Sequence, residues 1–229
     1  MKLSILILTH NRPKLFKRCL ESVLKQLPND AEVIVNNDSC DIEEILHPQV
    51  TYHYYKPETL CDIYKFLLEM ASGEYVYYLE DDDYLADDFT SVPLTADLIV
   101  GNYYPTYSPK YLIECLGMYD NELVWPEVFR EQMNLEHLQL SQHIFKRKSI
   151  LDFNFTADNN IHNDIRLVLH ASTRANKVQM MKKVFFYQTI DGGDNISFPE
   201  SNHSVNTTQT LDFLEDYGLQ APTPHTARS

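Results

Sequence analysis

The sequence predicts an α/β protein with a doubly wound, mostly parallel sheet, and three observations support that prediction. Short apolar runs that suit strands alternate with segments of helical periodicity. The first run, residues 3–8, is apolar apart from Ser4, as expected of a strand buried on both faces. Polar residues follow the runs, and right-handed crossovers would bring Thr9, residues 36–39 and residues 80–83 to one edge of the sheet.

The first hundred residues give the clearest series of elements. We expect strands over 3–8, 31–35, 50–55 and 76–79, and helices over 13–24, 41–46 and 60–70. Asn11 is the expected cap of the first helix, and Pro13 suits its first turn. Gly73 ends the third helix before the strand that precedes the acidic run.

The second half of the chain is less regular. Short strands are expected over 98–100 and 184–187, and a helix opens near residue 163. Between them, residues 103–125 are rich in tyrosine, and these rings either stack on sugars or bases or simply pack this half. We predict that residues 1–100 and 101–200 form two halves of one domain. A polar tail, residues 201–229, follows, with a short helix over 208–214 and disorder over 222–229.

Composition and charge narrow the class of protein. The formal net charge of −14 disfavours a general nucleic-acid coat protein, because phosphate neutralisation supplies most nonspecific affinity. No apolar window approaches the length of a membrane span, and the opening apolar run is too short for a signal peptide. Four scattered cysteines lack C-x-x-C spacing and are expected to be reduced. We therefore expect a soluble, cytoplasmic protein.

The acidic run at residues 80–83 is the most informative stretch. These four carboxylates follow directly on a predicted buried strand, so they lie where open α/β folds bind ligands. So many like charges are tolerable only in water or around a cation, and hard oxygen ligands suit Mg²⁺, Mn²⁺ or Ca²⁺. A solvated acidic turn is the alternative, but the preceding strand favours a metal site.

Three segments together resemble the family 2 glycosyltransferases of the GT-A fold. They are residues 4–12 (SILILTHNR), residues 33–39 (VIVNNDS) and residues 73–76 (GEYV) leading to 80–83 (EDDD). The resemblance covers the first ninety residues and implies a nucleotide-sugar donor. It also implies a divalent cation, Mn²⁺ or Mg²⁺, that bridges the donor diphosphate to the acidic run, and an acceptor side built from the irregular, aromatic-rich half.

The resemblance assigns roles to particular residues. Asp82 aligns with the principal metal ligand, and Asp81 and Asp191 are further candidates for the metal shell. Asp191 stands in a glycine-containing loop where the family usually has histidine, so it either completes that shell or caps a turn. The expected donor-binding residues are Thr9, Asn11, Arg12, Asn36, Asp38, Glu80, Asp81 and Asp83.

The nucleobase segment departs from the family. Asn36 and Asn37 stand where the family usually has an acid that accepts the N3–H of uracil. An asparagine carbonyl can accept the same bond, so a UDP-sugar remains the expected donor.

Asp164 is the expected catalytic base. It matches the second acid of the family's E-D motif, although Asn163 replaces the first. Without the resemblance, an aspartate in the first turn of a helix is most often only a favourable charge at the positive end.

The resemblance therefore implies a metal-dependent, inverting glycosyltransferase. Its acceptor would be a saccharide, a lipid-linked glycan or a modified DNA base, the last from a faint similarity to phage-type enzymes that glycosylate hydroxymethylcytosine. Two alternatives remain. A nucleotidyltransferase would need a glycine-rich basic loop after the first strand, which is absent from the sequence. A noncatalytic nucleotide- or cation-binding module would keep Asp82 and would not need Asp164.

Overall fold

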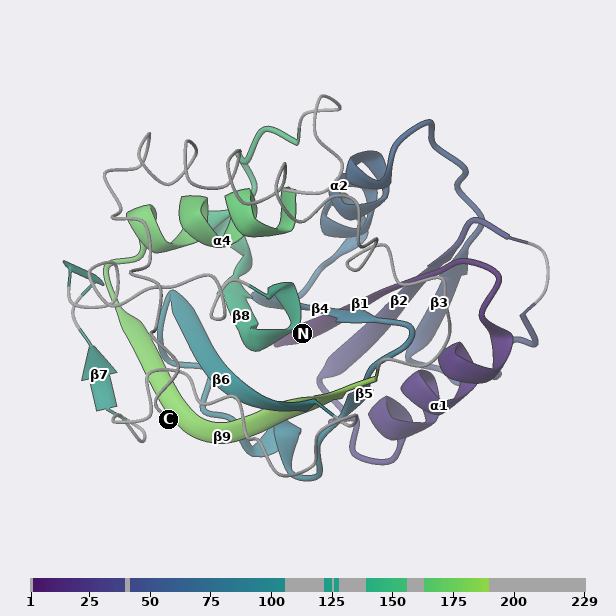
Figure 1. The fold of residues 1–229 in the computed structure, drawn as a ribbon, viewed down its shortest axis with the longest axis horizontal. Coiled ribbons are helices and arrows are strands. Elements are labelled where there is room, and N and C mark those ends of the chain that lie inside the picture. Colours follow the sequence, from purple (N-terminus) through teal and green to yellow (C-terminus); the bar gives the residue numbers. More distant parts are fainter. Residues whose placement is uncertain are drawn as a thin grey trace, which may run out of the picture.

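The computed structural model of the protein describes residues 2–39, 42–105, 122–124, 126–127, 139–155 and 163–189 (Figure 1). Its strands are β1 (Leu3–Thr9), β2 (Ala31–Asn37), β3 (Val50–His53), β4 (Tyr75–Glu80), β5 (Tyr84–Leu85), β6 (Leu98–Pro105), β7 (Glu122–Val124), β8 (His143–Lys146) and β9 (Val178–Gln188). Its α-helices are α1 (Pro13–Leu24), α2 (Leu60–Met70) and α4 (Asn163–Arg174).

All the strands join one sheet, which has two parts. Strands β3, β2, β1 and β4 are adjacent and parallel, which confirms the α/β prediction and places their carboxyl ends at one edge. Beyond β4 the sheet is mixed. Strands β8, β5 and β7 pair antiparallel with their neighbours, and only β6 and β9 pair in parallel. In Figure 1 the long strand β9 curls along β6.

Helices cover the sheet on both faces. Helix α1 packs on one face through Phe16, Cys19, Leu20 and Val23, and α2 and α4 cover the opposite face (Figure 1). Successive residues of a strand point to opposite faces, so β4 sends Tyr77 to the α1 side and Tyr78 to the α2 side. Burial on both sides explains why the strands read as continuous apolar runs.

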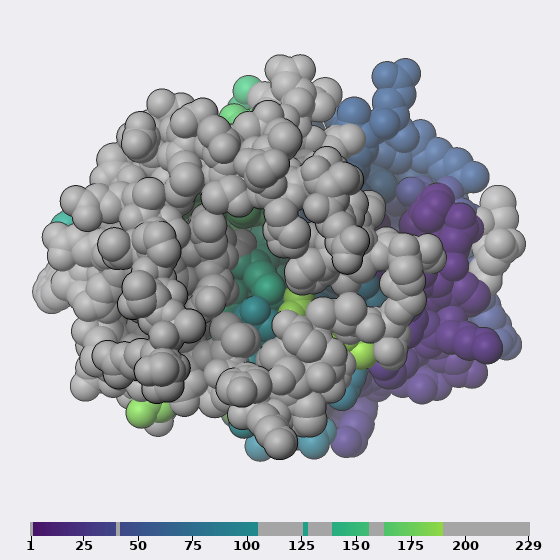
Figure 2. All heavy atoms as spheres, in the orientation of Figure 1, coloured from purple at the N-terminus to yellow at the C-terminus, as the bar shows by residue number. Residues whose placement is uncertain are grey.

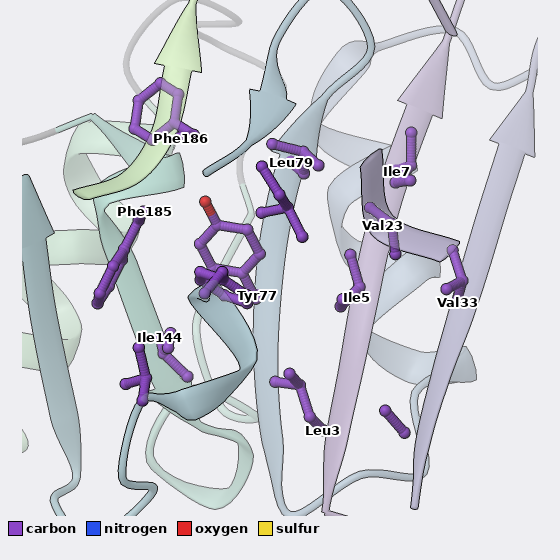
Figure 3. Packing of buried hydrophobic residues seen from close by; sticks show 14 of the residues in the cluster. Leu3, Ile5, Ile7, Val23, Val33, Tyr77, Leu79, Ile144, Phe185 and Phe186 are labelled. Carbon is purple, nitrogen blue, oxygen red and sulfur yellow. The ribbon is translucent and has the colours of Figure 1, made fainter. Parts of the chain in front are cut away.

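Tyr77 fixes β4, the strand that leads to the acidic run, in the middle of the core. Figure 3 shows its ring among Leu79, Ile144 and Phe185. The ring centroid lies 4.5 Å from that of Phe89, and the hydroxyl donates to the Ser141 backbone carbonyl at 2.7 Å. The acids at the end of β4 are therefore carried by a rigid strand.

Two local predictions in the first half were wrong. Asn11 does not cap α1: it adopts a left-handed conformation, with φ of 51°, and Arg12 takes the cap position without a side-chain bond. Residues 42–46 do not form the expected helix. The hydroxyl of Tyr52 accepts from the backbone N–H of Ile45 and donates to its carbonyl, which satisfies those groups without helical bonds.

Other predictions were confirmed with changed bounds, or concern residues outside the description. The strands predicted over 98–100 and 184–187 are the longer β6 and β9, and the third strand ends at His53. Residues 106–121, Asp191 and the tail, residues 201–229, lie outside the described residues.

No helix in the described part of the chain is long and apolar enough to cross a membrane. In Figure 2 the segments before residue 75, in purple and blue, lie together at the right of the face shown.

Candidate active site

The acidic run forms a tight, buried turn between β4 and β5. The backbone N–H of Asp83 donates to the Glu80 carbonyl at 3.1 Å and closes the turn. Asp81, Asp82 and Asp83 are only 5%, 7% and 5% exposed. A solvated acidic turn is therefore the wrong interpretation of these three aspartates, because each is largely removed from water.

Asp81 ties the turn to the end of β1. Its Oδ2 accepts from the Thr9 hydroxyl at 2.8 Å and from the backbone N–H of His10 at 3.4 Å, and its Oδ1 lies 3.1 Å from Arg12 Nη1. The backbone N–H of Asp38 also donates to the Thr9 carbonyl at 3.3 Å. These contacts confirm the predicted convergence of the carboxyl ends of β1, β2 and β4.

Among the ion pairs of the described residues, Arg12 is the cation that pairs with the carboxylates of this turn. The same Nη1 atom lies 3.0 Å from Asp82 Oδ2, so one nitrogen bridges Asp81 and Asp82. Burial raises the pKa of both aspartates, and the charge of Arg12 opposes that shift. Burial alone would lower the pKa of Arg12, but the two aspartates reverse this effect and raise it.

A second set of bonds fastens the turn to the end of β9. Arg18 Nη2 donates at 2.6 Å both to the Asp82 backbone carbonyl and to the Thr189 hydroxyl. That hydroxyl donates in turn to the Asp82 carbonyl, and the Thr189 N–H donates to Asp83 Oδ1 at 3.0 Å. Burial raises the pKa of Asp83 well above its usual range. Asp83, one of the expected donor-binding residues, accepts a backbone bond that ties the turn to the end of β9.

Asn36 supports the neighbouring loop. It is fully buried, its Nδ2 donates to the Tyr55 carbonyl at 3.0 Å, and its Oδ1 accepts from the Tyr55 N–H at 3.1 Å. Both ends of the amide expected to bind uracil are thus engaged by Tyr55. The pairing also explains why β3 stops at His53.

His10 and Asp38, which directly follow β1 and β2, contact each other at this edge. His10 Nδ1 lies 2.5 Å from Asp38 Oδ1, and the Asn11 side-chain amide donates to His10 Nε2 at 2.9 Å. The backbone N–H of Asn11 donates to the Ser39 hydroxyl at 2.9 Å. The His10 side chain remains 60% exposed, so its ring can contact a ligand at this edge.

Asp164 stands in the first turn of α4. It is half-buried, and the N–H of Ile165 donates to its Oδ1 at 2.8 Å. Burial raises its pKa to about 6, and hydrogen bonds from the backbone oppose the shift.

Glu80 connects Asp164 to the turn electrostatically. Glu80 keeps an exposed surface even though protein atoms crowd it on most sides. Its pKa is raised to about 8. Desolvation is the largest cause, and the charges of Asp82 and Asp164 add to it. Burial raises the pKa of the Tyr64 hydroxyl, and the charges of Glu80 and Asp164 raise it further. Glu80 and Asp164 therefore share one electrostatic environment.

Asn163, the departure from the family motif, has a packing role. It is 1% exposed, and its Nδ2 donates to Cys61 Sγ at 2.6 Å. The contact joins the first turn of α4 to the first turn of α2. It therefore fixes the helix end that carries Asp164.

The donor set suits a divalent cation that arrives with a nucleotide. Within the described residues, no three His, Cys, Asp or Glu side chains are grouped to hold a metal ion. Asp81 is bonded by Thr9, His10 and Arg12, whereas the Asp82 carboxylate is paired with Arg12, so Asp82 and Glu80 are the carboxylates of the turn that could more readily hold such an ion. One or two carboxylates completed by substrate phosphates are typical of Mg²⁺ sites for nucleotides.

Three residues of this site were not expected from the sequence. Arg18 was given no role, although it lies beside Cys19 in the buried stripe of α1, which was the available signal. His10 was part of the first motif and was given no role. Nothing in the local sequence marks Thr189, which acts only through contacts with distant residues.

The fold and the site define the class of protein. The parallel half-sheet, its mixed extension beyond β4 and the helices on both faces form an α/β fold of the GT-A glycosyltransferase type. Residues 4–96 match the model of the family described as glycosyl transferase family 2, which confirms the resemblance seen in the sequence.

Solved structures and curated proteins agree with that class. The structure of S. aureus TarS 1-349 in complex with UDP-GlcNAc has a TM-score of 0.67 and 18% identity, covering 93% of this chain and 67% of that one. Glycosyltransferase GlyA of Streptococcus pneumoniae is 23% identical over 57% of this chain and 22% of its own length. Chondroitin synthase of Pasteurella multocida is 24% identical over 91% of this chain and 23% of its own length. This chain thus spans less than a quarter of these two relatives.

Proposed function

We propose that this chain is a metal-dependent, inverting glycosyltransferase that moves a sugar from a UDP-sugar to an acceptor hydroxyl. The observation that carries the proposal is the position of Asp164. It lies near enough to the acidic turn for its charge to raise the pKa of Glu80, yet it comes from a separate element. A base on one segment and donor-binding acids on another are what a single displacement needs.

A uridine nucleotide is supported by the edge formed by β1 and β2. Asp38, Asn11 and the exposed His10 ring would lie against the nucleoside, beside the Tyr55 loop that Asn36 supports. Thr9 is fully buried and would act by holding Asp81. The structurally similar TarS has been solved with UDP-GlcNAc and with UDP. To bind uracil directly, the Asn36 amide would have to break its bonds to Tyr55. We therefore propose that Asn36 contributes to nucleotide binding by holding the Tyr55 loop in place.

Asp82 and Glu80 would hold the cation, with Asp191 as a further candidate outside the described residues. When bound, a divalent cation supplies positive charge that offsets the charge developing on the departing diphosphate. The protein's part is to hold Asp82 in place, which the bonds from Arg18 and Thr189 to its carbonyl do.

Asp164 would remove the proton from the acceptor hydroxyl as that oxygen attacks the anomeric carbon. A pKa of about 6 leaves Asp164 ionised at neutral pH while keeping it a better base than an ordinary aspartate. Attack opposite the leaving diphosphate in one step inverts the anomeric centre.

We propose a glycan as the acceptor. The net charge of −14 opposes close approach to nucleic acid, so a hydroxymethylated DNA base is the weaker candidate. The cytoplasmic location predicted from the sequence stays a prediction.

A thermal-shift screen of nucleotide sugars tests the donor and the metal together. A UDP-sugar should raise the melting temperature in Mn²⁺ and not in chelator, because a ligand that binds only the folded state stabilises it. Asp82→Asn should abolish the shift, whereas Asp87→Asn, which changes an exposed acid five residues away, should keep it. An equal shift in chelator would contradict the metal requirement.

Transfer is then assayed by release of UDP. A panel of glycans and duplex DNA containing hydroxymethylcytosine would be offered in parallel. Donor binding without transfer to any acceptor would favour the noncatalytic module, and diphosphate release from a nucleoside triphosphate would favour the nucleotidyltransferase.

A further inference from the structure

One nitrogen of Arg12 occupies the position of a bridging cation in the acidic turn. Nη1 lies 3.1 Å from Asp81 Oδ1 and 3.0 Å from Asp82 Oδ2. Both carboxylates are at most 10% exposed, so water contributes little to the neutralisation of their charge. Buried carboxylates are costly unless they are paired, and Arg12 is the pairing group that the structure shows for them.

The two aspartates differ in what else holds them. Asp81 also accepts bonds from the Thr9 hydroxyl and the His10 backbone N–H, so it stays in place without Arg12. The Asp82 carboxylate meets Arg12 through Oδ2, while its backbone is fixed separately by Arg18 and Thr189. Arg12 can therefore leave Asp82 without loosening the turn.

A divalent cation at Asp82 would be placed against the guanidinium. Like charges at such separations repel strongly where the surroundings are largely dry. A guanidinium also matches phosphate oxygens well, because its planar donors form paired bonds with them. The Arg12 side chain is 22% exposed, which leaves it room to reorient toward an incoming anion.

We propose that Arg12 is a positioning residue that serves as the resident counter-ion of the acidic turn. It keeps free divalent cations off Asp82 until a nucleoside diphosphate arrives. The diphosphate then draws the guanidinium away and brings the cation with it, so that metal and nucleotide bind together. The inference rests on the proposed metal-dependent function and adds an order of binding to it.

The test separates metal binding from nucleotide binding in the full chain. Free Mn²⁺ is measured by electron paramagnetic resonance without nucleotide, and UDP binding by calorimetry in saturating Mn²⁺. Arg12→Gln should bind Mn²⁺ about tenfold more tightly than the parent, since one neighbouring charge is commonly worth a factor of ten or more. It should bind UDP about tenfold more weakly for the same reason.

Lys25→Gln is the matched control. It also removes one positive charge from the α1 region, but from an exposed pair with Asp87. It should leave both affinities unchanged. A purely structural role of Arg12 would weaken both affinities or neither, so opposite shifts identify the counter-ion. Unchanged or weaker Mn²⁺ binding by folded Arg12→Gln would overturn the proposal.

A measurement on the parent protein covers the case in which Arg12→Gln fails to fold. The guanidinium resonance of Arg12, assigned with Arg12→Lys, should shift with Mg²⁺ plus UDP and hardly move with Mg²⁺ alone. An equal shift with Mg²⁺ alone would overturn the proposal. If the parent does not bind UDP, the proposed donor is wrong. Mn²⁺ binding by the parent and by Arg12→Gln, compared without nucleotide, still tests whether Arg12 keeps the cation off Asp82.

Discussion

The side-chain amide of Asn36 is paired with the backbone of Tyr55 at both of its polar ends. Nδ2 donates to the Tyr55 carbonyl and Oδ1 accepts from the Tyr55 N–H, at 3.0 and 3.1 Å. A fully buried residue of β2 thus shapes the loop after β3 in the way a neighbouring strand would. This relationship suggests that Asn36 matters first for stability and only indirectly for the nucleotide.

Asn36→Ala should lower the free energy of unfolding by about 1–3 kcal/mol, because it leaves two backbone groups of Tyr55 without partners. Urea denaturation would measure the change. Asn154→Ala, at an exposed asparagine, is the control and should be close to neutral. A stable Asn36→Ala that nevertheless loses UDP binding would show direct contact between Asn36 and the base.

Gly73 is required by the close approach of β4 to β1. A Cβ atom there would lie 2.6 Å from Ser4 Oγ, 2.7 Å from the Ser4 backbone nitrogen and 2.9 Å from the Leu3 carbonyl carbon. Gly73→Ala should therefore destabilise the protein by about 1–3 kcal/mol, as overpacking usually does. Thermal or urea unfolding would report it.

A second substitution shows which contact causes the destabilisation by Gly73→Ala. Ser4→Ala removes the hydroxyl and leaves the backbone contacts in place, so the double variant should stay destabilised. Full rescue by Ser4→Ala would mean that the side chain alone causes the crowding and that the strands can tolerate a Cβ.

The sequence predicted the part of the site that topology determines. Parallel strands with right-handed crossovers must bring Thr9, Asp38 and the acidic run to one edge, whatever the details of packing. The structure shows that edge in the bonds between Thr9, Asp81 and Asp38. The order and type of the first strands were predictable for the same reason.

Side-chain geometry between distant segments was not predictable. Arg18 and Thr189 are 171 positions apart, and only the folded chain shows that they share the Asp82 carbonyl. The short helix expected over 41–46 failed similarly, since the Tyr52 hydroxyl satisfies the backbone of Ile45. In both cases a tertiary contact overrides what neighbouring residues favour.

Thr189 should prove important for the acidic turn. Thr189→Val keeps the shape of the side chain but removes the hydroxyl that links Arg18 to the Asp82 carbonyl. We expect a loss of about 1–3 kcal/mol of stability, because buried partners are left unsatisfied. Binding of UDP with Mn²⁺ should weaken too, since the backbone of Asp82 loses a restraint.

Thr51→Val is the matched control for Thr189→Val. Thr51 lies exposed on the edge strand β3, where valine suits a strand equally well. It should preserve stability and binding. Equal behaviour of the two variants would mean that the link between β9 and the acidic turn contributes nothing.

Asp164→Asn should separate binding from catalysis. The amide keeps the shape of the carboxylate and can still accept the N–H of Ile165, but it cannot take a proton. Transfer should fall by about 10²–10⁴-fold, the range typical of a positioned base. Affinity for UDP and Mn²⁺ should change little, because the donor acids lie on the turn after β4. Rates within a few fold of the parent would refute the assignment.

The pH dependence gives a second test of the same residue. Since the pKa of Asp164 is about 6, the parent's rate should be level at higher pH and fall about tenfold per unit below it as the base becomes protonated. The free energy of unfolding changes with pH in the opposite direction to the rate. A raised pKa means that the folded state binds the proton more tightly than the unfolded state, so the parent loses stability as pH rises from about 4 to 6. Asp164→Asn lacks that loss and should be at least as stable as the parent at pH 7, with the difference closing toward pH 4. A parent rate that stays level through pH 5 would place the essential base elsewhere.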